Sequence, residues 1–216
     1  FFQAQDGIRD PLWSRGLGDV YKRQHLYLCH LFTQLPLSCN ILRMKHILLT
    51  IILFFASESF ACSGILDSSL RVLDSDDEQS LCEYTGNVVL VVNVASKCGY
   101  TPQYAGLQRL YSRYKEDGLV IIGIPSRDFF QEYSDESKVA EFCSTEYGVD
   151  FPMFATAKVS GKKAHPLYKK LIAASGKEPN WNFNKYLIDR EGRVQHYKSS
   201  VTPESERLVT AIQAVL

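Results

Sequence analysis

Cys98 is the residue whose type and setting point most directly to chemistry. It lies in the segment NVASKCGYT (93–101), a polar turn between an apolar run and a helical pattern. The start of a helix presents unpaired N–H groups and partial positive charge, which favour a thiolate over a thiol. We therefore predict a reactive thiolate at this position, with an inert buried cysteine as the alternative.

The other cysteines bear on the redox compartment. The chain has six cysteines, many for a reduced cytosolic enzyme and few for a small disulfide scaffold. Cys62 and Cys82 flank residues 65–81, whose pattern indicates a small hairpin around residues 74–77. We expect a structural disulfide across the base of this hairpin if the protein is exported, and lipidation of Cys62 is the incompatible alternative.

The elements that position Cys98 are predicted from hydrophobic patterning. Residues 88–95 (VVLVVNVA) form an apolar and β-branched run, typical of a strand buried on both faces of a parallel sheet. Apolar side chains then recur at helical spacing between residues 104 and 114, and residues 119–124 (LVIIGI) indicate a second buried strand. The resulting right-handed βαβ unit places Cys98 at the carboxyl end of a strand, where reactive groups gather in such sheets.

The rest of the chain adds helices and a second hairpin. Their expected positions are a helix over 134–146, a helix that starts at His165, strands at 186–188 and 194–197, and a last helix from residue 202. Pro203 is expected at the first position of that last helix. The order ββ-βαβ-α-ββ-α predicts an α/β, thioredoxin-like fold, with a central mixed β-sheet flanked by helices and an N-terminal β-hairpin.

Four sequence blocks resemble one known family. They are NVASKCGYTPQYAGLQ around Cys98, FPMF (151–154), AHPLYKKL (164–171) and WNFNKYLIDREG (181–192). In this order they resemble the blocks of glutathione peroxidases, in which cysteine or selenocysteine occupies the position of Cys98. The resemblance covers residues 64–216 and implies a thiol peroxidase that reduces hydroperoxides.

The resemblance also implies a catalytic tetrad of Cys98, Gln131, Trp181 and Asn182. The two amides and the indole N–H are donors that could stabilise a thiolate and the departing hydroxide. Taken alone, Trp181 could be a core residue, Gln131 a solvated residue and Asn182 a turn cap. The loop that carries Gln131 (PSRDFFQEYS, 125–134) departs from a common family pattern, FPCNQFGGQEPG, and is one residue shorter. The position of Gln131 therefore depends on the geometry of this loop.

Cys143 matches the resolving cysteine of the family's two-cysteine members. An oxidised Cys98 could condense with this second thiol, which would protect it from over-oxidation. The alternative is a core cysteine on an apolar helix face. The resemblance therefore implies a thioredoxin-like protein as reductant, favoured over glutathione. Two other functions stay open: a peroxide sensor that passes oxidation to a partner protein, and a binding module without activity.

The first 61 residues are expected to lie outside the working domain. Residues 1–43 lack a sustained period, and SRGLGDVYKRQ (14–24) resembles the translation of a sequencing adapter. Residues 44–61 have the basic start, apolar core and small residues of a signal peptide, so residues 62–216 form the predicted domain. Cleavage before Cys62 also leaves a lipoprotein as an alternative.

Composition excludes several other classes. The net charge is zero and basic residues form no stripe, so nucleic acid is not an expected partner, nor is a membrane unless Cys62 is lipidated. No zinc-type cluster or glycine-rich phosphate loop occurs, and we therefore expect no metal and no cofactor. A short segment before Trp181 favours a monomer.

Overall fold

The computed structural model describes residue 62 and residues 64–216. The predicted adapter-derived segment (1–43) and signal peptide (44–61) lie outside the described residues, so both remain predictions. Within the described part of the chain, no helix combines the length and the apolar character that crossing a membrane requires.

A four-stranded sheet with the order β4-β3-β5-β6 forms the centre of this domain. The strands are β3 (Val88–Val94), β4 (Leu119–Pro125), β5 (Lys185–Ile188) and β6 (Val194–Tyr197). β3 pairs in parallel with β4 and antiparallel with β5, so the sheet is mixed, as the sequence predicted. Every residue of β3 is buried, because it lies between two strands and both of its faces are covered.

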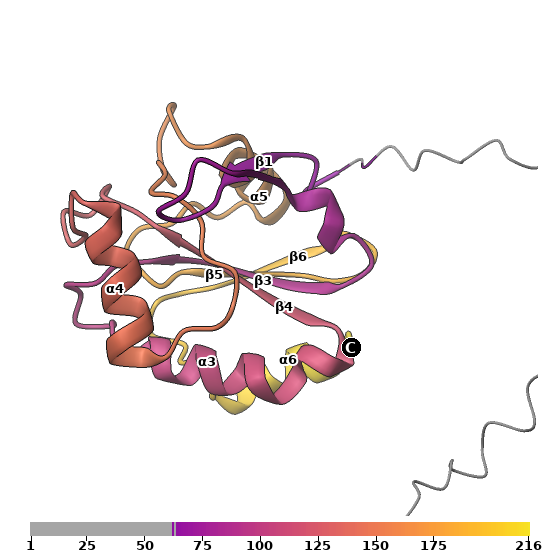
Figure 1. Cartoon of the computed structure of the whole chain (residues 1–216). Helices are drawn as coiled ribbons and strands as arrows, with labels where there is room; N and C mark the ends of the chain where they lie inside the picture. Colours follow the sequence, from indigo (N-terminus) through magenta and orange to yellow (C-terminus); the bar gives the residue numbers. More distant parts are fainter. Residues whose placement is uncertain (1–61, 63) are drawn as a thin grey trace, which may run out of the picture. The chain divides into compact units, whose positions relative to one another are not determined.

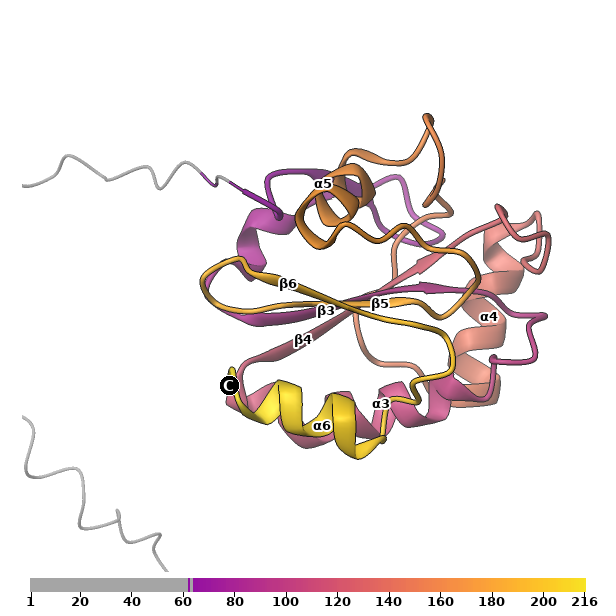
Figure 2. The same cartoon turned by 180° about the vertical axis from the view of Figure 1, so that it is seen from behind.

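Helices cover both faces of this sheet (Figures 1 and 2). The helices are α3 (Gln103–Tyr114), η3 (Lys115–Asp117), α4 (Glu136–Tyr147), α5 (Pro166–Ser175) and α6 (Glu206–Gln213). α3 and α6 lie on one face, α5 lies on the other, and α4 packs beside α3. Side chains alternate along β3: Leu90 and Val92 join the core cluster under α3 and α6, while Val89 and Val91 join the cluster under α5.

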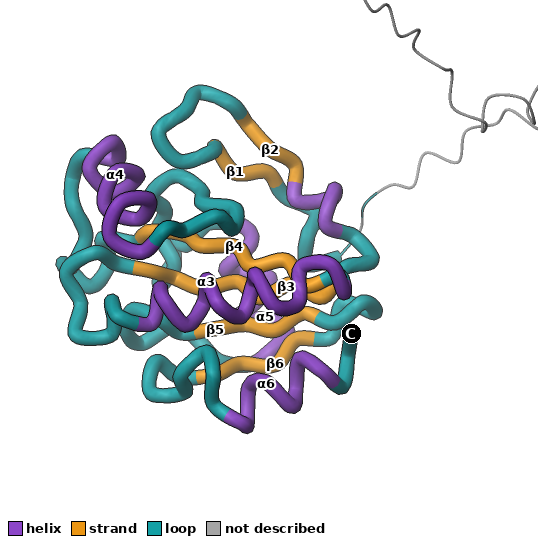
Figure 3. The backbone as a smooth tube through the Cα atoms, turned by 60° about the horizontal axis from the view of Figure 1, so that its bottom comes forward, coloured by secondary structure: helices purple, strands orange, loops and turns teal. Residues whose placement is uncertain are grey.

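The N-terminal hairpin is separate from the main sheet (Figure 3). β1 (Ser69–Arg71) pairs antiparallel with β2 (Glu78–Ser80), and the short helix η2 (Leu81–Tyr84) follows. Leu70 and Leu81 are buried in the core cluster on the α5 side. Apolar packing therefore attaches the hairpin to the domain.

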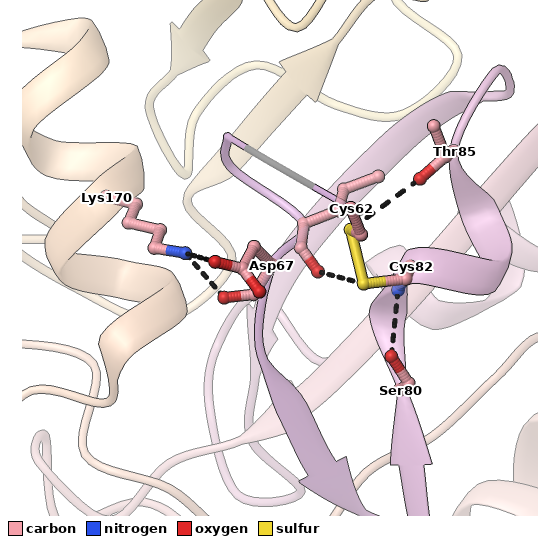
Figure 4. Close-up of a disulfide and its surroundings, with 7 residues drawn as sticks. Cys62, Asp67, Ser80, Cys82, Thr85 and Lys170 are labelled. Carbon is pink, nitrogen blue, oxygen red and sulfur yellow. Dashed lines mark hydrogen bonds and ion pairs between the residues drawn. A yellow bond between two sulfur atoms is a disulfide. The ribbon is translucent and has the colours of Figure 1, made fainter. Parts of the chain in front are cut away.

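A disulfide joins Cys62 to Cys82 beside this hairpin (Figure 4), the pair for which the sequence analysis expects one. The two Cα atoms are 5.5 Å apart, a normal span for a disulfide. Close by, the Lys170 ammonium of α5 lies 3.5 Å from a carboxylate oxygen of Asp67. The hairpin is thus held covalently at its base as well as by packing.

The start of the last helix differs from the sequence prediction. α6 begins at Glu206, so the prediction that Pro203 stands at its first position was wrong. Ser205 is extended, with φ −63° and ψ 140°, and its N–H donates to the Thr202 carbonyl at 3.1 Å. This turn precedes the helix, and a favourable proline in a turn cannot be distinguished by sequence from a proline at a helix start.

Candidate active site

Cys98 lies in a tight turn directly after β3 and is 7% exposed. The Thr101 hydroxyl closes this turn: its oxygen accepts from the Cys98 N–H at 2.9 Å and donates to the Ala95 carbonyl at 2.8 Å. The Cys98 sulfur accepts from the Tyr100 N–H at 3.4 Å. Because α3 begins only at Gln103, the backbone donor at the sulfur comes from the turn and not from the first turn of the helix.

The loop after β4 brings Gln131 to this turn. The Gln131 carbonyl accepts from the Lys97 N–H at 2.9 Å, one residue before Cys98. The Gln131 side-chain oxygen accepts from the Asn182 amide at 3.0 Å. The shortened loop therefore places Gln131 between the Cys98 turn and Asn182. Gln131 and Asn182 are thus hydrogen-bonded to each other, and the Gln131 backbone is bonded to the residue that precedes Cys98.

Trp181 and Asn182 precede β5 and differ in exposure. Trp181 is 41% exposed, so the alternative of a core residue does not apply. Its ring packs on Phe129 of the β4 loop, with ring centroids 5.7 Å apart. Its carbonyl accepts from Asn93 of β3 at 2.9 Å. Asn182 is fully buried. Both residues lie at the same edge of the sheet as Cys98, because Asn93 belongs to the strand that leads to that cysteine.

Glu132 is a site residue that the sequence analysis did not identify. Its carboxylate is 8% exposed and accepts from the Ser96 N–H at 3.1 Å and the Tyr133 N–H at 2.8 Å. Burial raises the pKa of Glu132, and the hydrogen bonds oppose that rise. The carboxylate thus fastens the Gln131 loop to the Cys98 turn. A glutamate in a polar loop shows no periodicity, so no sequence signal marked its burial.

Cys143 is 2% exposed on the inner face of α4. Asp135 caps α4, and the helix therefore begins two residues later than predicted. Burial raises the pKa of Cys143 to about 11. Tyr104 of α3 lies against Cys143, and this contact adds to burial in raising the pKa of the tyrosine. Cys98 and Cys143 are both free thiols, so the structure represents the reduced state.

Three exposed aromatic side chains belong to the predicted tetrad or lie close to it in the sequence. Tyr100, Phe130 and Trp181 are the large apolar side chains that are exposed in the described part of the chain. Each lies within two residues of a tetrad member. Phe130 is 94% exposed and has φ +59°, a left-handed conformation that is strained for a phenylalanine. It lines a cleft of about 460 Å³ together with Arg127 and Lys158. We call Tyr100, Phe130 and Trp181 the aromatic rim.

The described residues contain no cluster of three or more histidine, cysteine or acidic side chains with metal-binding geometry. The reactive groups that the site does present are the two thiols and the hydrogen-bond donors around Cys98.

Comparison with known proteins gives one consistent result. The family profile named glutathione peroxidase matches residues 66–172. The glutathione peroxidase homolog BsaA of Halalkalibacterium halodurans is 45% identical over 146 residues, which cover 65% of this chain and 92% of that protein. The thioredoxin/glutathione peroxidase BtuE of Escherichia coli is 37% identical over 172 residues. The match covers 67% of this chain and 94% of that protein. Among solved structures, the protein in the crystal structure of Trgpx in its apo form is 33% identical in sequence, and the two structures superpose with a TM-score of 0.57. The superposition covers 71% of this chain and 96% of that chain.

Proposed function

Because the chain belongs to the glutathione peroxidase family and is therefore a thiol peroxidase, we propose that Cys98 is its peroxide-attacking residue. The Cys98 thiolate attacks one oxygen of the hydroperoxide. The S–O bond forms as the O–O bond breaks, and the leaving alkoxide or hydroxide takes up a proton. Cys98 is left as a sulfenic acid. The observation that carries this assignment is the nearly buried Cys98 sulfur with a backbone N–H directed at it.

We propose that Gln131, Trp181 and Asn182 stabilise the charges that form in this step. The Gln131 oxygen accepts from Asn182, which leaves the Gln131 amide N–H groups free to donate elsewhere. The indole N–H of Trp181 makes no hydrogen bond among the described residues, so it too is available as a donor. Donors arranged in advance around a developing anion lower the barrier because they need no reorganisation.

In the second step, Cys143 is proposed to attack the Cys98 sulfenic acid, form a disulfide and release water. Burial raises the pKa of Cys143 to about 11, so this thiol is protonated at rest and has to lose its proton when it attacks the sulfenic acid. An external dithiol then reduces the disulfide. The name of the E. coli relative includes both thioredoxin and glutathione, which supports either as the donor. Measuring the rate of peroxide reduction by this protein with thioredoxin and with glutathione, side by side, tests this proposal.

The alternative function is a sensor that passes oxidation from Cys98 to a partner protein. Cys143 argues for turnover instead, because an internal resolving thiol competes with any external partner for the sulfenic acid. A peroxidase should turn over steadily with a dithiol, whereas a sensor should accumulate a mixed disulfide with one partner.

The monomeric state that the sequence favours remains a prediction, which gel filtration can check.

We propose that organic hydroperoxides are the preferred substrates, because the aromatic rim exposes apolar surface that hydrogen peroxide cannot use. Burying part of one ring is worth about 1–2 kcal/mol. The Phe130 backbone is strained by about 1 kcal/mol or more in this structure, in which the Cys98 thiol is free. A contact between Phe130 and the substrate would explain why an aromatic ring stands at this position.

Phe130→Gly is expected to lower kcat/KM for cumene hydroperoxide by about tenfold while the value for hydrogen peroxide stays within about twofold. The variant should also unfold at a slightly higher temperature, since glycine adopts the left-handed conformation without strain. Phe130→Asn is the matched variant, because asparagine tolerates this conformation and has no apolar ring. Equal losses with both peroxides would contradict a role in substrate preference.

We also propose that the protein is exported. The signal-peptide pattern of residues 44–61 and the Cys62–Cys82 disulfide support this, because disulfides persist in oxidising compartments. In a peptide map of the exported protein without reduction, we expect the N-terminal peptide to begin at Cys62 and to be linked to the peptide of Cys82. An acylated Cys62 would establish the lipoprotein instead. An intact Met44 terminus would exclude cleavage.

A further inference from the structure

The segment that carries Trp181 and Asn182 is held by buried side chains at three consecutive carbonyl groups. The hydrogen bonds are Asn93 and Asn184 to the Trp181 carbonyl at 2.9 and 2.8 Å, Ser199 to the Asn182 carbonyl at 2.6 Å, and Lys185 to the Phe183 carbonyl at 2.8 Å. The donors come from β3, the residue before β5, β5 itself and the loop after β6. Several elements of the domain therefore converge on this one short segment.

Lys185 is the unusual member of this set. Its side chain is fully buried within β5, at the position paired with Val92 of β3. The Phe183 carbonyl is its single hydrogen-bond partner, and no carboxylate pairs with it among the described residues. Burial lowers the pKa of Lys185 to about 7. A buried amino group without a counter-charge costs free energy that an apolar side chain would not, whether it carries its proton or has lost it, so packing alone does not account for this residue.

The carbonyl that Lys185 binds belongs to a strained residue. Phe183 has φ +62°, the left-handed region in which a phenylalanine is disfavoured. Its N–H donates to the Asn93 carbonyl at 2.6 Å, on the strand that leads to Cys98. The Phe183 backbone is thus bound at its N–H by β3 and at its carbonyl by Lys185. Loss of either contact would let this residue return to an unstrained conformation and move Asn182 and Trp181 with it.

We propose that Lys185 is a positioning residue, which holds the left-handed turn at Phe183 and so sets the place of Trp181 and Asn182 beside Cys98. This inference rests on the proposed catalytic role of those two residues. Lys185 makes no contact with the peroxide in this scheme. It acts through the backbone of the segment that carries the donors.

The test is Lys185→Met, which keeps the length of the side chain and removes the ammonium. We expect kcat/KM for hydrogen peroxide to fall about tenfold while the unfolding temperature stays equal or rises.

The fluorescence of Trp181 provides a direct readout of the position of this side chain. The full chain has two tryptophans, Trp13 and Trp181, and cleavage before Cys62 leaves Trp181 as the single tryptophan emitter; in an uncleaved chain, a Trp13→Phe background does the same. The emission maximum of Trp181 should shift in Lys185→Met. Leu187→Met is the matched control, because Leu187 is buried on the same face of β5.

The possible outcomes distinguish a positioning role of Lys185 from a purely structural role. A wild-type rate and unshifted Trp181 emission in Lys185→Met would overturn the proposal, and a fall in rate that tracks a loss of stability would show a purely structural role. Lys185→Gln keeps a hydrogen-bond donor without charge and should recover part of the rate. If the wild-type protein itself lacks peroxidase turnover, or Cys98→Ser retains it, the proposed function fails instead.

Discussion

Cys98→Ser is expected to abolish turnover with every peroxide and every reductant, a loss of at least about a thousandfold. Serine offers no thiolate at neutral pH, and nothing else in the site replaces the sulfur as nucleophile. The substitution is nearly isosteric, and the serine oxygen can still accept from the Tyr100 N–H that now binds the sulfur. The fold should therefore survive. Peroxide consumption with excess thioredoxin, and then with excess glutathione, measures the effect.

A measurement of stability serves as the control for Cys98→Ser. Thermal unfolding of Cys98→Ser should match that of the wild type, which ties the loss of activity to chemistry and not to folding. Residual activity above about one per cent of the wild-type rate would mean that another residue attacks the peroxide. Cys143 would then be the next candidate, because it is the other free thiol among the described residues.

Cys143→Ser is expected to separate the two steps of the reaction. Cys98 should still react once with peroxide, since Cys143 takes no part in that attack. The sulfenic acid should then accumulate and over-oxidise because no internal thiol resolves it. Thioredoxin-supported turnover should fall by about a hundredfold or more, an estimate from the loss of an intramolecular reaction partner. Glutathione-supported turnover can persist, because glutathione attacks the sulfenic acid directly. Mass spectrometry after dimedone labelling measures the sulfenic acid.

The burial of Cys143 calls for a second variant. A serine hydroxyl at a site that is 2% exposed lacks an assured partner and can cost about 1–3 kcal/mol. Cys143→Ala removes the thiol without this penalty and should behave in the same way toward both reductants. Ser144→Ala, on the exposed side of α4, is the matched control and should retain wild-type turnover. Full thioredoxin-dependent activity in both Cys143 variants would show that this cysteine is only a core residue.

The sequence by itself determined the elements whose signals are local. The continuous apolar run of β3 and β4 and the helical period of α3 specify a buried βαβ unit, and the structure confirms it. The turn with Cys98 follows from this unit, because a polar segment between a buried strand and a helix must lie at the sheet edge. Local spacing around a hairpin left two possibilities for Cys62, a disulfide to Cys82 or lipidation, and the structure contains the disulfide.

The resemblance of sequence blocks supplied Gln131, Trp181 and Asn182, which patterning alone did not distinguish from ordinary polar and core residues. Only the tertiary structure shows that the shortened loop still pairs Gln131 with Asn182. The exposure of Phe130 could not be predicted from the sequence either, because an apolar residue in a loop is as compatible with burial as with contact to a ligand.

The burial of Glu132 and Lys185 was decided by tertiary structure alone. In sequence, each is a charged residue, and charged residues are normally solvated. Their burial depends on partners distant in the chain: the Ser96 N–H for Glu132, and for Lys185 the packing of β5 between β3 and β6. A sequence pattern records the polarity of each position, whereas the free energy of a buried charge depends on which groups surround it after folding.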